Sequence, residues 1–298
     1  MEKTLTTLIT GGCSYTDQNY KPYLDNNIKT WPSFLADHYG YNLVNTASGG
    51  YGNRHIVNSV IDSIIDHEMK DEVVVCVAWS EPYRLSFIDD PDLDHPIFLF
   101  SDEEYERRLT FSEGLARYFK FIEDGRKELI KYIVRRQEKT GSKDPFKKMV
   151  DLNSKIIIQS YRNMYYLQDF CYNRDIPLFH MHTFDPFAFD RQLSSELYMP
   201  NDKDAQKKAS DDAIDIIKKS QYFRKVEKDI GYMGHKYNLY NDLSSEGFFI
   251  DDDGKVNKHP NQKGHEYISE RFREFIDLGD RLYNHTDASY RDVLYLWE

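Results

Sequence analysis

The sequence predicts an α/β protein, a three-layer α/β/α fold with a mainly parallel, flavodoxin-like sheet, and two observations predict it. Three strand-like runs at 4–10, 42–46 and 72–78 alternate with helix-like segments at 31–39 and 56–65. The run at 72–78, E-V-V-V-C-V-A, is almost entirely apolar, as in a strand that is covered on both faces. Strands that alternate with helices favour a parallel sheet between two helical layers.

Local composition justifies each element of the first half. The first run, T-L-T-T-L-I-T, is rich in β-forming residues and ends at two glycines. The segment 31–39 spaces its apolar residues along one helix face, and Pro32 stands in the first turn, where proline is tolerated. The second run precedes a glycine turn, and isoleucines and valines from 56 to 65 then form a helical stripe.

The second half breaks this alternation. Residues from about 101 to 175 are charged, rich in tyrosine and helically patterned, which predicts a helical insertion within a single domain spanning 1–298. Strand character returns at 176–182, I-P-L-F-H-M-H. Residues 202–230 are polar and helical in pattern, and 264–278 reads as a closing helix.

Composition and charge limit the classes of function. The chain has 298 residues, of which 40% are hydrophobic, enough for a sizeable core. Its 39 Lys and Arg against 50 Asp and Glu leave a net charge of −11, which repels a phosphate backbone, so we expect no nucleic-acid partner. The 3 cysteines fit neither a disulfide framework nor a metal motif and indicate a reducing compartment. No signal peptide or membrane span is recognisable, so we expect a cytoplasmic protein without a membrane partner.

The stretch L-I-T-G-G-C-S-Y-T-D, residues 8–17, places Ser14 where the first strand ends. Open α/β sheets bind ligands at this edge, and amides in a tight glycine turn can stabilise an oxyanion. On this stretch alone, an ordinary strand-to-helix turn with Ser14 or Thr16 as the N-cap is the alternative. Cys13 is the other potential nucleophile, but neighbouring side chains on extended backbone face opposite ways, and we choose Ser14.

Two further segments have a matching position in the predicted fold. The second glycine cluster, N-T-A-S-G-G-Y-G-N at 45–53, follows the second strand and opens on the same edge, although a flexible turn has the same composition. The segment V-N-K-H-P-N-Q-K-G-H at 256–265 precedes the closing helix and places His259 on a predicted loop. A histidine on a loop is a better functional candidate than one on an apolar helix face.

Together, these three segments resemble the SGNH/GDSL hydrolase superfamily. In that family a serine follows the first strand, a glycine after the second strand lines the oxyanion hole, and a histidine precedes the last helix. The resemblance implies that Ser14 is the nucleophile, that Gly50 donates to the oxyanion and that His259 is the general base. It covers the ends of the chain and the three strands between, and leaves the residues from about 101 to 175 unexplained.

The sequence departs from the family pattern after the third strand. The family's G-x-N-D block is replaced by A-W-S-E-P-Y-R at 78–84, so the asparagine donor is missing. The side chains that remain as substitute donors for the oxyanion or the substrate are Asn53, Trp79, Ser80 and Arg84. A Trp and an Arg after the third strand resemble a phage-type or bacterial branch of the superfamily.

A second departure concerns the acid that orients the histidine. The family places an aspartate three residues before the histidine, and that position here is Val256. Asp251, Asp252 and Asp253 lie just upstream, and we choose Asp253. The alternatives are an acidic surface turn, combined with either a Ser-His dyad or a backbone carbonyl that holds the imidazole.

These motifs predict a serine-dependent esterase or deacylase that acts on a small-molecule or carbohydrate-borne ester and needs no cofactor. The same motifs also fit an enzyme that transfers the acyl group to an acceptor other than water. The alternative from another class is a non-catalytic protein that binds a glycan or another ligand, within a viral or surface assembly. His180 and His182, with Asp185 nearby, have a spacing that can bind zinc, but no third ligand is identifiable, so no metal is predicted.

Overall fold

The computed structural model describes residues 6–68, 72–82, 84–85, 97–98, 144–187, 202–252 and 255–284. The chain divides into two compact units. The first comprises Met1–Glu81, Ser160–Pro186 and Gln221–Glu298, and the second comprises Pro82–Gln159 and Phe187–Ser220. Most of the predicted insertion, residues 101–143, lies outside the described residues, so a single domain with an insertion stays a prediction.

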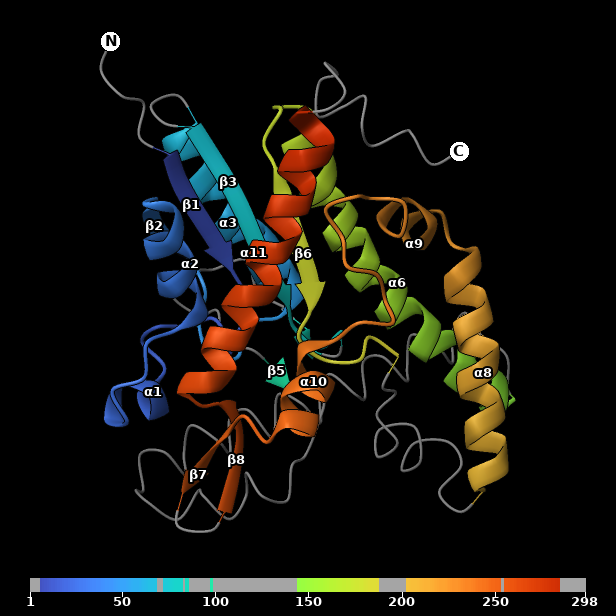
Figure 1. The fold of residues 1–298 in the computed structure, drawn as a ribbon. Coiled ribbons are helices and arrows are strands. Elements are labelled where there is room, and N and C mark those ends of the chain that lie inside the picture. Colours follow the sequence, from blue (N-terminus) through green and yellow to red (C-terminus); the bar gives the residue numbers. More distant parts are fainter. Residues whose placement is uncertain are drawn as a thin grey trace. The chain divides into compact units, whose positions relative to one another are not determined.

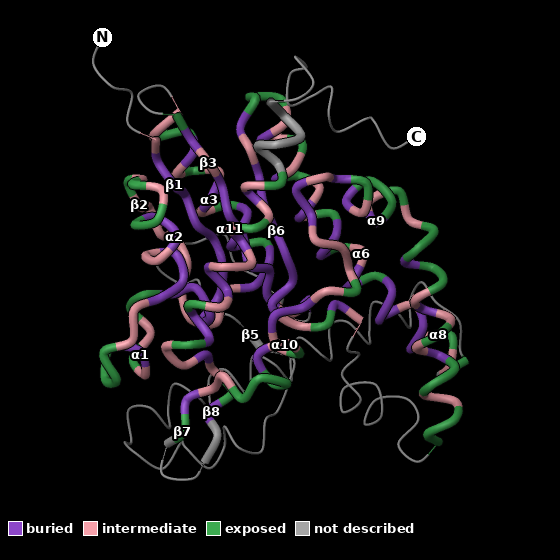
Figure 2. Tube along the Cα trace, viewed as in Figure 1, coloured by how far each residue is buried: buried purple, intermediate pink, exposed green. Residues whose placement is uncertain are grey.

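A four-stranded parallel sheet forms the centre of the first unit (Figure 1). Its strands are β1 (Thr6–Gly11), β2 (Asn42–Asn45), β3 (Glu72–Trp79) and β6 (Leu178–His182), in the order β2-β1-β3-β6. This is the flavodoxin-like order that the sequence predicts, and the predicted fold class is confirmed. Figure 2 shows β1, β3 and β6 almost entirely buried, which agrees with the nearly continuous apolar run of β3.

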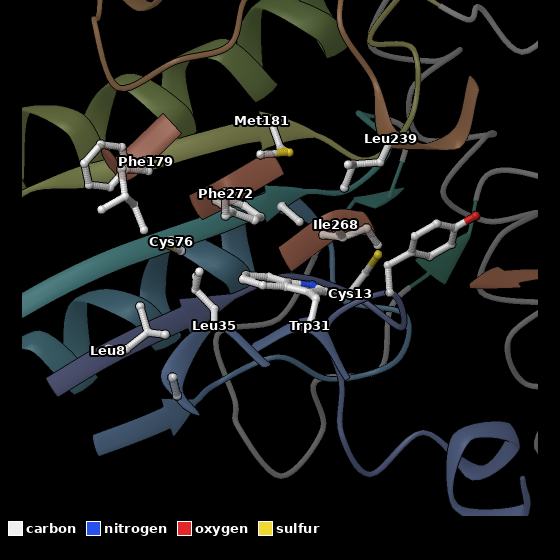
Figure 3. Packing of buried hydrophobic residues seen from close by; sticks show 14 of the residues in the cluster. Leu8, Cys13, Trp31, Leu35, Cys76, Phe179, Met181, Leu239, Ile268 and Phe272 are labelled. Atoms are coloured by element: carbon white, nitrogen blue, oxygen red, sulfur yellow. The ribbon is translucent and has the colours of Figure 1, made fainter. Parts of the chain in front are cut away.

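Helices cover both faces of this sheet. Helices α2 (Trp31–Tyr39) and α11 (Gln262–Asn284) pack on one face, and α3 (Asn53–His67) packs on the other face, against β1 and β3. Figure 3 shows how the apolar side chains of the first face interlock. The rings of Trp31 and Phe272 stack with centroids 4.4 Å apart, which joins α2 to α11.

The closing part of the first unit contains elements that the sequence analysis missed. They are α10 (Leu239–Glu246) and an antiparallel pair of strands, β7 (Phe249–Asp252) and β8 (Lys255–Pro260). The short helix α1 (Lys21–Asp25), earlier in the chain, was also missed, whereas α9 (Gln221–Val226) lies within the predicted helical segment 202–230. The prediction that His259 lies on a loop is wrong, because it lies near the end of β8. The D-G pair at 253–254 is a common hairpin signal, and we interpreted it as an acidic turn.

The second unit is described in four pieces. These are β4 (Arg84–Leu85), β5 (Ile97–Phe98), the first part of α6 (Pro145–Tyr172) and α8 (Lys203–Lys219). Met149 and Val150 on α6 pack with Ala209 and Ala213 on α8, which buries one side of each helix. In the described parts of both units, no helix combines the length and apolar character needed to cross a bilayer.

Candidate active site

A single helical turn follows β1 and presents Ser14. The carbonyl oxygen of Cys13 accepts hydrogen bonds from Thr16 N at 2.8 Å and from Asp17 N at 3.0 Å. Gly12 is required immediately before this turn, because a Cβ atom there would overlap the side chain of Thr16 and crowd the carbonyl oxygen of Ala78. The glycine therefore lets the nucleophile turn lie directly against the end of β3.

The turn separates the two potential nucleophiles. Cys13 is fully buried and belongs to the apolar cluster between the sheet, α2 and α11. Ser14 is 5% exposed, and its Oγ atom lies 3.0 Å from Nε2 of His259. This geometry agrees with the choice of Ser14 over Cys13, since the Cys13 side chain is packed in the apolar core.

The structure also provides a partner for the other ring nitrogen of His259. Nδ1 lies 2.7 Å from Oδ1 of Asn257, a residue that is 4% exposed. Both residues belong to β8, and residues i and i+2 of a strand point to the same face. Sequence reasoning missed Asn257 because it placed His259 on a loop; the N-K-H spacing on a strand is the signal that identifies it.

Tyrosine rings surround the imidazole. The Tyr20 ring lies 4.5 Å from the His259 ring between centroids, with Tyr15 at 5.6 Å and Tyr23 at 6.4 Å. The Tyr15 hydroxyl donates to the carbonyl oxygen of Lys258 at 2.6 Å, which fixes the backbone next to His259. Burial, followed by the nearby Tyr15 and Tyr20, raises the pKa of Tyr23 well above its usual value, so this wall is uncharged at neutral pH.

A second histidine, His265, lies behind these rings. Its Nδ1 atom accepts a hydrogen bond from Trp31 N at 3.3 Å, and its ring meets the Tyr23 ring edge-on at 4.6 Å. Burial, followed by the nearby His259, lowers the pKa of His265 to about 3. His265 is therefore neutral at physiological pH and adds no positive charge beside His259.

Asp17 and Asn45 tie the second glycine segment to the nucleophile turn. One carboxylate oxygen of Asp17 accepts from Asn19 N and the other from Gly49 N, both at 2.8 Å. The side-chain amide of Asn45 donates to Thr16 O at 2.8 Å, and its oxygen accepts from Ala47 N at 3.1 Å. These bonds join the two segments that the sequence predicts to share one edge.

Two backbone amides in these segments are available to a ligand. Within the described ranges, neither Ser14 N nor Gly50 N donates to another residue. Ser14 N is the first amide of a helical turn, and such an amide has no carbonyl group one turn earlier in the helix to accept its hydrogen bond. Gly50 has a φ of 88°, a conformation that glycine adopts without strain. The sequence analysis expects Gly50 as an oxyanion donor, and this role stays a prediction.

Two of the predicted side-chain donors, Asn53 at the start of α3 and Trp79 at the end of β3, form hydrogen bonds inside the fold. Asn53 accepts from Ser80 N at 2.8 Å and donates to Ser80 O at 3.1 Å and to Ser160 Oγ at 2.6 Å. The indole N–H of Trp79 donates to Nδ1 of His180 at 2.9 Å, and the Trp79 side chain is fully buried. Ser80 is 1% exposed, and its hydroxyl has no partner among the described residues. In this structure Asn53 and Trp79 serve as internal links.

The remaining predicted site residues are Arg84 and Asp253. Arg84 is in β4 and belongs to the second unit. Asp253, the predicted acid, lies outside the described residues. Asp251 is exposed on β7, where it pairs with Val256 in the strand register. The nitrogen of His259 that an acid would bind is bonded to Asn257.

The two histidines of β6, His180 and His182, are both buried. His180 accepts from Trp79 at Nδ1, and its Nε2 atom lies 3.3 Å from Oδ2 of Asp229. Both ring nitrogens of His182 are buried without a partner among the described residues, and burial lowers its pKa to about 3. In the part of the chain that the structure describes, no group of three or more His, Cys, Asp or Glu side chains is placed to hold a metal ion.

Comparisons with known proteins find similarity in structure alone. No protein-family model and no curated protein sequence matches the chain. A psychrotrophic esterase from a Pseudoalteromonas species, inhibited by monoethylphosphonate, is 11% identical with a TM-score of 0.40, and the match covers 91% of this chain and 96% of the esterase. A GDSL-like lipase from Bacteroides thetaiotaomicron is 11% identical with a TM-score of 0.37, covering 93% and 90% of the two chains. Because both TM-scores are below 0.5, the proposal of a function rests on the residues of this chain.

Proposed function

We propose that this protein is a serine-dependent hydrolase of carboxylic esters, an esterase or deacylase, with Ser14 as nucleophile and His259 as general base. The observation that carries the proposal is the distance of 3.0 Å between Ser14 Oγ and His259 Nε2, two atoms that are 245 residues apart in sequence. A nucleophile and a base within hydrogen-bonding distance are what this chemistry requires.

The proposed reaction begins when the Ser14 oxygen forms a bond to the ester carbonyl carbon and His259 takes the hydroxyl proton. The carbonyl oxygen becomes an oxyanion, which the amides of Ser14 and Gly50 stabilise. The ester C–O bond then breaks, and the leaving alkoxide takes the proton from His259. Water attacks the acyl-enzyme, again with His259 as base, and releases the acid and free Ser14.

The substrate class follows from the surroundings of the pair. Tyr15, Tyr20 and Tyr23 form a neutral aromatic wall around His259. Such rings pack against the apolar face of a sugar or against an acyl chain. We therefore propose a small-molecule or carbohydrate-borne ester as substrate, with water as the acceptor of the acyl group.

A fluorophosphonate probe tests the proposal directly, because it forms a stable bond with an activated serine. We expect labelling of the wild-type chain and a loss of at least about a thousandfold in rate for Ser14→Ala and for His259→Gln. The matched controls are Ser33→Ala and His38→Gln, which change the same residue types on α2. An unlabelled wild-type chain with an intact circular dichroism spectrum contradicts the proposal.

The second candidate is a ligand-binding protein without catalysis. It is favoured by the side chains after β3, because Asn53 and Trp79 use their donors internally and the family's asparagine is missing. Removal of one oxyanion donor costs about a hundredfold or more in rate. Binding of sugars or simple esters by an unlabelled chain would support this candidate.

A further inference from the structure

We infer that Asn257 is the positioning residue for His259: its amide oxygen holds the imidazole in the Nδ1–H tautomer, in the place that an acid occupies in a Ser-His-Asp triad. This inference rests on the proposed function, because its role is to prepare His259 to accept the proton of Ser14. It also specifies that the group in contact with Nδ1 of His259 is a neutral amide and not a carboxylate.

The contact is short and buried. Oδ1 of Asn257 lies 2.7 Å from Nδ1 of His259, and Asn257 is 4% exposed. A buried amide oxygen without a donor is destabilising, so the ring N–H and the amide oxygen stabilise each other. Because the two residues are neighbours on one face of β8, the backbone of the strand sets their separation.

The chemistry of the amide fixes the tautomer. An amide oxygen accepts hydrogen bonds but cannot donate one, so Nδ1 opposite Oδ1 must carry a hydrogen. A neutral imidazole has only one N–H, and Nε2 is then free to accept from the Ser14 hydroxyl 3.0 Å away. The opposite tautomer would present an N–H group to Ser14 and could not take its proton.

The neutral amide also affects when His259 is protonated. Among the described residues, the rings of Tyr15, Tyr20 and Tyr23 contact the His259 ring, and His259 interacts electrostatically with His265. The charged groups on adjacent segments are Asp17, Asp251 and Lys258, of which the last two are exposed. A carboxylate at position 257 would add a negative charge next to Nδ1, which the neutral amide of Asn257 lacks, so substitution by Asp tests the role of the amide.

NMR of ¹⁵N-labelled protein tests this inference without relying on activity. We expect the ring nitrogens of His259 to show the Nδ1–H tautomer in the wild-type chain, with the signal assigned by its loss in His259→Gln. In Asn257→Asp the measured pKa of His259 should rise by about 1 to 3 units, because an opposite charge has been placed against Nδ1. The matched control, Asn42→Asp, adds the same charge at the exposed start of β2 and should leave the titration unchanged.

Labelling kinetics give the functional readout. Asn257→Ala should slow fluorophosphonate labelling at least about tenfold, and Asn257→Asp should restore it above the raised pKa of His259, which moves the acid limb of the pH profile upward. An Nε2–H tautomer in the wild-type chain, or an unchanged pKa in Asn257→Asp, would falsify the inference even if Asn257→Ala fails to fold. If the tautomer and the pKa shift are observed but the wild-type chain does not label, the hydrolase proposal fails while the positioning role of Asn257 stands.

Discussion

The carboxyl ends of β1 and β3 lie next to each other in the sheet, yet their polar groups are used in opposite ways. After β1, Ser14 contacts His259, and the amides of Ser14 and Gly50 have no partner among the described residues. After β3, the polar groups of Trp79 and the Ser80 backbone bond to His180 and Asn53 inside the fold. We call the first the open end, because its donors have no acceptor among the described residues. We call the second the closed end, because its donors form hydrogen bonds within the fold.

This difference shows how residues that could bind a substrate can be distinguished from residues that stabilise the fold at the same edge of the sheet. Both ends carry residue types that can stabilise an oxyanion, so residue type alone does not distinguish them. The distinction lies in which donors already have acceptors, since a donor that is bonded in the fold is not available to a substrate without breaking that bond. Variants at the two ends should therefore separate effects on rate from effects on stability.

The largest effect is expected at Asp17, which holds the open end together. In Asp17→Asn one of the two acceptors for Asn19 N and Gly49 N is replaced by a donor, so the Gly50 amide should shift. We expect fluorophosphonate labelling to slow by about 10- to 100-fold, less than the full loss of an oxyanion donor. The matched control is Asp37→Asn, an exposed carboxylate on α2. Equal labelling rates in the two variants would remove Asp17 from the site.

The next-largest effect is expected from loss of a hydrogen bond at the closed end. Trp79→Phe removes the indole N–H and leaves Nδ1 of His180 buried without its donor, which should lower the free energy of unfolding by about 1 to 3 kcal/mol. The labelling rate should stay within about twofold of the wild type. Urea unfolding followed by circular dichroism measures the first quantity, and probe kinetics measure the second.

A matched tryptophan sharpens this result. The indole N–H of Trp31 donates to Thr16 Oγ1 at 3.3 Å, so Trp31→Phe removes the same group next to the nucleophile turn. We expect a similar loss of stability together with slower labelling. A drop in labelling for Trp79→Phe as large as that for Trp31→Phe would mean that the two ends are not distinct.

The smallest effect concerns pH and involves two buried histidines, His182 at the end of β6 and His265 on α11. Burial lowers the pKa of His182 and His265 to about 3, below the unfolded value of about 6.5. Between these values the unfolded chain binds protons that the native chain does not, so stability is retained above pH 6.5 and falls as the pH drops toward 3. Each histidine contributes a slope of at most about 1.4 kcal/mol per pH unit.

Unfolding in urea at pH 7, 6 and 5 measures this slope. His182→Gln and His265→Gln should each flatten it, because glutamine does not titrate, and the exposed His38→Gln should leave it unchanged. A slope that survives both substitutions would assign the pH dependence to other groups.

The sequence predicts the fold more completely than the site. The strand-like runs identified in the sequence correspond to β1, β2, β3 and β6, and α2 matches its predicted bounds of 31–39. These elements are predictable because burial and helical spacing are local signals. Ser14 and His259 were also identified from sequence, through a resemblance to a known family.

The parts that sequence reasoning missed depend on local geometry that differs from the family pattern. The family's acid stands three residues before the histidine, but His259 lies on a strand, and there the residue two positions before it shares its face. The search for an acid at 251–253 therefore passed over Asn257. Similarly, Asn53 and Trp79 were proposed as donors because their internal acceptors, Ser80, Ser160 and His180, become neighbours only in the folded chain.

The contact between Ser14 and His259 joins two points that are 245 residues apart. No fragment that ends before β8 contains both Ser14 and His259, so under the proposed function a growing polypeptide is inactive until β8 has reached the Ser14 turn. A covalent probe of Ser14 would then label folded molecules and not incomplete or misassembled ones. Under that proposal, labelling of Ser14 reports whether the chain has completed its fold.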